Sequence, residues 1–318
     1  MPHATTQVVR ALCRALRRNA EALARDFSRA RRGDVGAVHR VRVATRRLRA
    51  ALPLAAESDR LRTGDLKRDL KRVTRALGDV READVVREIL LDLAERHDWT
   101  PPVVARVERA CVARRNDRRT AMREKLSDLR APALEKRVDD VADKLESDDP
   151  DARTVAVVLA AVYKRSRQLG AAIDGAGTVY GVDPLHKVRL ATKKLRYALE
   201  AADGVLDKGD DRARRRLKRF QERLGNIHDM QVAQRYVRAT QNERDVTTAV
   251  AAQLAEVDQA LDVQCRQLHG QVLRERPAVI KMLAELTTAI EARLTLRRVG
   301  RMARMRTRRT MRRLEVGT

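Results

Sequence analysis

Residues 38–52 read VHRVRVATRRLRAAL, and residues 185–199 read LHKVRLATKKLRYAL. The two stretches place His39 and His186 at the same point, 147 residues apart. Core packing alone would explain apolar residues at matching positions, but it would not require a histidine and five basic residues at matching positions. The chain is therefore interpreted as an internal duplication, and the duplicated unit includes a basic, histidine-bearing helix face.

A second pair of segments supports the duplication. Residues 77–84 read LGDVREAD and residues 224–231 read LGNIHDMQ, again 147 residues apart. A glycine inside a helix costs about 1 kcal/mol relative to alanine, and close helix packing is the expected reason for the glycine of each segment. The acids Glu82 and Asp229 are expected to pair with basic side chains of a neighbouring helix and to hold them in place.

Long helices are expected along almost the whole chain, because Ala, Leu, Arg and Glu dominate and no strand-like alternation persists. Breaks at Gly, Pro and Asp predict helices near 4–32, 36–57, 62–97, 101–130 and 132–147, and then near 151–173, 184–204, 209–242, 244–271 and from about 277. Asp34 and Asp183 are the expected N-caps of the second helix in each repeat.

Four long helices per repeat are typical of a helical bundle. The sequence therefore predicts an all-α fold of two four-helix bundles related by a pseudo-twofold axis. The first bundle is expected to span residues 1–150 and the second residues 151–296, with an Arg-rich C-terminal segment at residues 297–318. The alternative is one continuous, irregular helical domain.

The chain carries a strong positive charge. Its formal net charge is +25 and its isoelectric point is near 11.1. Residues 1–150 hold 35 basic and 25 acidic residues, and residues 151–318 hold 34 and 19, so both halves are cationic. A field of this sign attracts polyanions. Residues 297–313 contain nine arginines and no acid, and this segment is expected to add general affinity for any polyanion.

The cysteine spacing and the apolar pattern indicate the cellular compartment of the protein. Cys13, Cys111 and Cys265 lie far apart without CxxC spacing, which predicts reduced thiols that act as small core residues. The longest apolar run, residues 155–163, is too short to span a bilayer, and the N-terminus has no apolar signal core. We expect a cytoplasmic protein with no membrane partner.

The basic residues of the duplicated stretches form a stripe on each helix. At 100° per residue, His39, Arg42, Arg46 and Arg49 fall within about 80° of one another and border the buried face. Such a stripe can follow a chain of anionic groups, although most charge runs are simply solvated faces. The candidate anion-binding residues are His39, Arg42, Arg46, Arg47, Arg49, Lys67, Lys71, Arg75, His186, Arg189, Lys193, Lys194, Arg196, Arg214, Lys218 and His228.

Catalysis is not expected from these residues. The sequence has no phosphate-cradling Gly-rich loop, no HExxH and no CxxC. The six histidines do not fall at metal-ligand spacings, and their neighbours are mostly basic. We therefore expect no catalytic residue, no metal and no cofactor. Each histidine of the two stripes is expected to donate a hydrogen bond to a phosphate, whose charge would raise the pKa of the imidazole.

The motifs at residues 38–49 and 185–197, with the Leu-Gly segments at 77–84 and 224–231, resemble the CHAD family of conserved-histidine α-helical domains. The resemblance covers most of the chain. It implies two four-helix bundles around a basic central cleft, non-enzymatic binding of inorganic polyphosphate, and a location at polyphosphate granules. The resemblance does not indicate a protein partner.

Nucleic acid is the alternative partner, because a basic helical protein attracts any polyanion. Proteins that bind single strands use aromatic side chains as stacking platforms, and this chain has seven aromatic residues in 318. Polyphosphate has no bases to stack and favours dense Arg and Lys instead. Duplex DNA and structured RNA need no aromatic platform, so they remain as possible weaker partners.

Overall fold

The structure, a computed structural model, describes residues 2–59, 63–97, 99–147, 152–202 and 210–315. The regular elements within these ranges are all helices: α1 (Pro2–Arg32), α2 (Val35–Asp59), α3 (Gly64–Arg96), α4 (Pro101–Lys125), α5 (Ala131–Ser147), α6 (Ala152–Ala176), α7 (Val182–Ala201), α8 (Asp210–Gln241) and α9 (Thr248–Glu315). The all-α prediction is confirmed. Across these ranges, no helix combines the length and the apolar character that a bilayer crossing requires.

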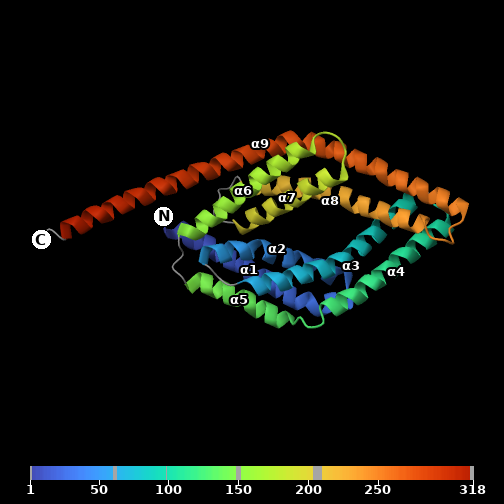
Figure 1. The fold of residues 1–318 in the computed structure, drawn as a ribbon, viewed down its shortest axis with the longest axis horizontal. Coiled ribbons are helices and arrows are strands. Elements are labelled where there is room, and N and C mark those ends of the chain that lie inside the picture. The colour runs from blue at the N-terminus through green and yellow to red at the C-terminus, as the bar shows by residue number, and fades with distance from the viewer. Residues whose placement is uncertain (1, 60–62, 98, 148–151, 203–209, 316–318) are drawn as a thin grey trace.

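The helices form two groups that lie against each other (Figure 1). The blue-to-green group holds α1 to α5, and the yellow-green-to-red group holds α6 to α9. Across the junction, α2 packs on α6 and α7, and α3 packs on α8. The contact between α2 and α7 brings together the two helices that carry the predicted stripes.

Two apolar cores hold the helices together, and each core takes side chains from both halves of the chain. The larger core unites α1, α2, α5, α6 and α7 with the first part of α3, the end of α4, the first part of α8 and the middle of α9. The smaller core includes Leu90 of α3, Val107 of α4, Val237 of α8 and Leu261 of α9. It lies where the α3–α4 and α8–α9 pairs extend together away from the larger core (Figure 1).

The three cysteines are core residues, as predicted. Cys13 and Cys265 lie in the larger core and Cys111 lies in the smaller one, and all three are free thiols. Burial raises the pKa of Cys13 to about 12 and that of Cys111 to about 11. These thiols therefore stay protonated at neutral pH and contribute packing.

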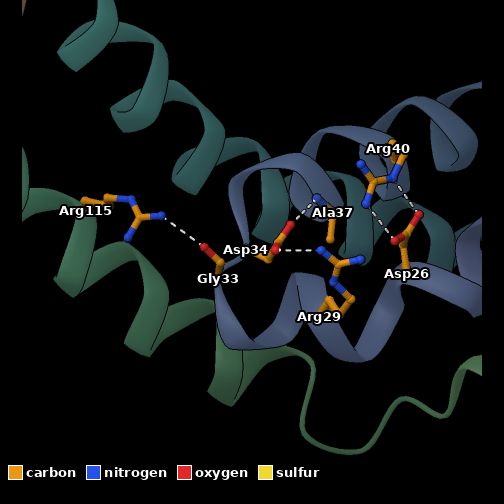
Figure 2. Close-up of polar contacts among 7 residues, drawn as sticks. All are labelled: Asp26, Arg29, Gly33, Asp34, Ala37, Arg40 and Arg115. Carbon is orange, nitrogen blue, oxygen red and sulfur yellow. Dashed lines mark hydrogen bonds and ion pairs between the residues drawn. The ribbon is translucent and has the colours of Figure 1, made fainter.

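The turn between α1 and α2 is fixed by polar contacts, which Figure 2 shows. The Asp34 carboxylate accepts hydrogen bonds from the Ala37 N–H at 2.7 Å and from Arg29 at 2.9 Å. Asp34 is thus the N-cap of α2, as predicted. Gly33 has a φ of +89°, and its carbonyl accepts a hydrogen bond from Arg115 of α4 at 3.0 Å. This turn sets the angle at which α2 leaves α1.

An ion pair between the first two helices then holds α2 in place. Arg40 donates two hydrogen bonds to the Asp26 carboxylate, at 2.7 and 2.8 Å (Figure 2). Asp26 is 5% exposed, and the hydrogen bonds from Arg40 lower the pKa of its carboxyl. With α2 fixed against α1, Arg42 and Arg46 of its basic stripe lie close to Arg189 of α7.

Several expected helix ends are wrong: the helix predicted over 101–130 ends at Lys125, and the helix predicted from 244 begins at Thr248. The helix predicted to begin after Asp183 begins at Val182 instead, with Gly181 in the cap position. The first four N–H groups of a helix have no partner within it, so Pro184 is tolerated anywhere in this first turn. The break expected between residues 271 and 277 does not occur, because α9 continues through Pro277. Packing of α9 on both α8 and α6 holds the helix together across the proline.

The packing role expected for the glycines of the Leu-Gly segments is also wrong. A Cβ atom built on Gly78 of α3 or on Gly225 of α8 would meet nothing within 4 Å in the described part of the chain. Neither glycine has a φ in the left-handed region. Each lies inside a long helix, where glycine costs about 1 kcal/mol relative to alanine.

Candidate functional site

Four cations meet where α2 packs on α7. Arg42 and Arg46 come from α2, and Arg189 and Lys193 come from α7. The charges of Arg46 and Arg189 lower the pKa of Arg42, and the charges of Arg189 and Arg46 lower that of Lys193. All four side chains are partly buried. We call these four residues the central cluster.

Burial and mutual repulsion both act on the central cluster. Burial is the largest cause of the shift at Arg42, whose pKa falls to about 10, so this guanidinium stays charged at neutral pH. Burial and the neighbouring arginines lower the pKa of Lys193 to about 6. The fold thus keeps like charges together at an energetic cost, and a nearby anion would relieve it.

One carboxylate of α8 partly balances these charges. An Asp229 carboxylate oxygen lies 3.9 Å from a terminal nitrogen of Arg189, whose side chain is 12% exposed. Burial raises the pKa of Asp229, although the charges of Arg189 and Lys193 oppose this shift. The prediction that Asp229 pairs with a basic residue of a neighbouring helix is confirmed. Burial lowers the pKa of Arg189, and the charges of Asp229 and, more weakly, of Glu82 on α3 oppose this shift.

Several guanidinium nitrogens near this site are buried without a hydrogen-bond partner. Within the described ranges, the Nε atoms of Arg42, Arg189 and Arg196 make no hydrogen bond. A buried donor left unpaired costs about 1–3 kcal/mol. The arginines of the two stripes therefore hold hydrogen-bonding capacity that the protein itself does not use.

The histidines of the two motifs lie beside these cations. The rings of His186 and His228 have centroids 5.4 Å apart. Burial and the charge of Arg189 lower the pKa of both, and that of His228 falls to about 3. Burial and the charges of Arg81 and Arg42 lower the pKa of His39. All three imidazoles are thus neutral at neutral pH, and each offers one N–H donor.

Two candidate arginines pair with an acid instead. The Nε of Arg47 donates to Glu200 at 3.2 Å, across the junction between α2 and α7. The Nε of Arg196 lies 3.6 Å from the same carboxylate, and its guanidinium lies over the Tyr197 ring at 5.1 Å. The Arg47–Glu200 contact joins α2 to α7, whereas the contacts of Arg196 with Glu200 and Tyr197 lie within α7.

The other candidates lie around the central cluster or away from it. Burial, and then the charges of Arg46 and Arg75, lower the pKa of Arg49, so these three residues continue the cationic surface toward α3. Lys218 pairs with Glu222 on its own helix at 3.9 Å. Exposed or partly buried positions elsewhere on α3, α7 and α8 hold Lys67, Lys71, Lys194 and Arg214.

Sequence reasoning missed two cations of this site. Arg81 of α3 lowers the pKa of His39 and of Arg42, and Arg235 of α8 lowers the pKa of His186 and His228. A signal for Arg81 existed, because it lies 147 residues before His228 in the matching Leu-Gly segment. No comparable pattern pointed to Arg235.

The donors gathered here suit an anion. The described residues contain no group of three or more His, Cys, Asp or Glu side chains arranged to hold a metal ion. The central cluster instead offers guanidinium and ammonium groups, which bind phosphate oxygens through charge-assisted hydrogen bonds.

Comparisons with known proteins agree with the all-helical fold. The chain is 30% identical over 225 residues to "Uncharacterized protein MT2285" of Mycobacterium tuberculosis (strain CDC 1551 / Oshkosh). The match covers 66% of this chain and 42% of that protein, so the chain spans less than half of its relative's length.

Two solved structures share the fold. PptA from Streptomyces chartreusis superposes with a TM-score of 0.60 at 21% identity, over 87% of this chain and 99% of that one. The CHAD domain from the plant Ricinus communis superposes with a TM-score of 0.53 at 20% identity, over 92% of both chains. Residues 9–238 match the CHAD domain family. The chain therefore belongs to the CHAD family, which is linked to polyphosphate binding in general.

Proposed function

We propose that this protein binds inorganic polyphosphate at the central cluster and does not transform it. The single observation that carries the proposal is the meeting of Arg42 and Arg46 with Arg189 and Lys193, beside one paired carboxylate. A chain of phosphates would supply the negative charge and the acceptors that these side chains lack. Since each link of polyphosphate carries charge, one chain can contact both stripes.

The proposal includes the architecture inferred from the repeats. We propose two helical bundles related by duplication, at residues 1–150 and 151–296, with a basic cleft between them. The packing of α2 on α7 and of α3 on α8 supports this arrangement, because each pair joins matching helices of the two halves. The Arg-rich segment at 297–318 would then add general affinity for polyanions.

Polyphosphate is favoured over nucleic acid because the site offers cations without aromatic platforms. Tyr197 lies under the guanidinium of Arg196, and Tyr236 lies under that of Arg114. Aromatic rings covered in this way are poor surfaces for stacking bases. Nucleic acid remains the second candidate partner, as a polyanion attracted by the same field.

No chemical step is proposed. The acid nearest to the cations, Asp229, interacts with Arg189, and the three imidazoles are surrounded by positive charge. These groups are suited to holding an anion in place. A protein that only binds polyphosphate would be expected at polyphosphate granules, and we propose that location.

A competition assay at fixed salt tests this function. Labelled long-chain polyphosphate is bound to the protein, and unlabelled polyphosphate or duplex DNA is added at equal phosphate concentration. We expect polyphosphate to displace the label at a concentration at least about tenfold lower than DNA, a difference of about 1.4 kcal/mol. Equal displacement by both polymers would make this a general polyanion binder and would overturn the proposal.

The low pKa of Lys193 predicts a pH dependence of binding. Because this pKa is about 6, the amine is mostly neutral above pH 7 in the absence of an anion. A phosphate beside it favours the charged form, so binding takes up a proton. Affinity is therefore expected to fall as pH rises from about 7.5 to 9, by up to about tenfold per pH unit. Binding isotherms at several pH values measure this.

The variant Lys193→Arg is the matched control. Its guanidinium also carries a positive charge, but unlike the lysine amine it stays protonated from about pH 7.5 to 9. We expect binding by this variant to change much less with pH, and its affinity at the alkaline end to exceed that of the wild type. The same pH dependence in both proteins would show that Lys193 does not take up the proton.

A further inference from the structure

Two glycines at matching positions have no role in the protein's own packing. Gly78 and Gly225 lie 147 residues apart, inside α3 and α8. As shown above, a side chain at either position would meet nothing within 4 Å among the described residues, and neither backbone needs glycine for its φ. Their cost to helix stability is therefore not offset by any contact or conformation that the described chain supplies.

Both glycines lie on the helix faces that carry residues of the site. Three and four residues after Gly78 come Arg81 and Glu82, which share its face of α3. The same spacing after Gly225 leads to His228 and Asp229 on α8. Arg81 and His228 act on the central cluster or on the histidines beside it.

Because the two glycines lie beside the site, the helix surface that they leave uncovered can let a phosphate approach the site's donors. A charge-assisted hydrogen bond requires donor and acceptor within about 3 Å, and the site's donors are partly buried. A phosphate can reach a partly buried donor only if no side chain stands between them. A methyl group one helical turn away from the donor would hold the phosphate further out.

We propose that Gly78 and Gly225 are binding-site residues that leave room for the phosphate chain on α3 and α8. In this arrangement the chain lies against bare helix at both positions and so reaches the partly buried cations on either side. The inference rests on the proposed function, because it assumes that the site's ligand is a phosphate polymer. It adds two uncharged residues that shape the site by having no side chain.

Substitutions of increasing size test the proposal. We compare Gly78→Ala/Gly225→Ala with Gly78→Leu/Gly225→Leu, since alanine and leucine are both good helix formers but differ in volume. Both double variants are expected to melt a few degrees higher than the wild type, because each removes two helical glycines. Polyphosphate affinity is expected to fall about tenfold for the alanine pair and more than about a hundredfold for the leucine pair.

Gly270 of α9 provides the matched control. It also lies inside a long helix, and a Cβ there would make only an ordinary contact of 3.8 Å with Arg274. Its neighbours on the same face, Arg266, Gln267 and Arg274, are exposed. The variants Gly270→Ala and Gly270→Leu are expected to bind polyphosphate as the wild type does. They separate the loss of space at the site from a general effect of stiffening a helix.

The outcomes distinguish this inference from the proposed function. If the wild type does not bind polyphosphate, the proposed function fails and the inference fails with it. If the wild type binds and the glycine variants bind equally well, the inference alone is overturned. A loss of the same size for alanine and leucine would also overturn it, because that result indicates lost helix flexibility instead of lost space.

Discussion

Replacing all four residues of the central cluster with alanine is expected to weaken polyphosphate binding by roughly a thousandfold or more. The variant carries Arg42→Ala, Arg46→Ala, Arg189→Ala and Lys193→Ala. A single hydrogen bond to a charged group is worth about 1.5–3 kcal/mol, so losing four of them exceeds this threshold even when their energies are not additive. Isothermal titration calorimetry with long-chain polyphosphate measures the change.

The folded state of this variant is not expected to suffer. Its three arginines repel one another, and burial disfavours the charges of Arg42, Arg189 and Lys193. Removing them relieves this repulsion but leaves Asp229 without its partner Arg189. Circular dichroism at 222 nm and a thermal melt check that the helices remain.

An equal loss of charge elsewhere provides the control. Arg14, Arg109, Lys136 and Lys281 are exposed residues of α1, α4, α5 and α9, and replacing them with alanine also lowers the net charge from +25 to +21. This control is expected to lose only a small part of the affinity, through the weaker overall field. If both quadruple variants lose affinity equally, the site is not at the central cluster.

A truncation after Leu296 separates the C-terminal segment from the site. It removes the nine arginines of residues 297–313. A charged arm that contacts any polyanion raises association with polyphosphate and DNA alike. We therefore expect weaker binding of both polymers with little change in their ratio, whereas the central-cluster variant should lose polyphosphate preferentially.

Salt is expected to weaken binding steeply. For single-stranded polyanions the logarithm of the affinity falls by about 0.7 per neutralised phosphate for each tenfold rise in salt. Contact with about eight phosphates gives a slope of roughly −5 to −6, so that a threefold rise in salt lowers the affinity by about 200- to 700-fold. Isotherms at four or more salt concentrations give the slope.

The salt slope of the central-cluster variant tests whether these four residues neutralise phosphates. If each of its four cations neutralises one phosphate, the slope should become shallower by about 3. The control that lacks four exposed cations should keep nearly the wild-type slope. A wild-type slope near zero would mean that the stripes are solvated helix faces and bind no polyanion.

The sequence predicted the helices of the site but not all of its contacts. Helical spacing placed Arg42 and Arg46 on one face of α2, and the repeat placed Arg189 and Lys193 likewise on α7. Spacing along one helix does not reveal which acid on another helix is within reach. For that reason the pairing of Arg47 with Glu200 could not be predicted.

Two other differences between the prediction and the structure also arise from contacts between helices. Pro277 was expected to end a helix, because proline lacks an N–H donor and its ring clashes with the preceding turn. Packing of α9 on two neighbouring helices overrides this local preference. The glycines of the Leu-Gly segments were assigned to close packing, which only the positions of other helices could test.

The sharing of both cores between the halves has a consequence for how such a chain could arise. Residues 1–150 alone would expose the faces of α2 and α3 that pack on α6, α7 and α8. The smaller core would keep Leu90 and Val107 but lose their partners Val237 and Leu261. On the duplication proposed above, an ancestor with a single repeat would have needed a second copy of itself to bury these surfaces. Fusion of the two copies would have turned an obligate dimer into one chain, and a site formed at their contact would have become free to differ on its two sides.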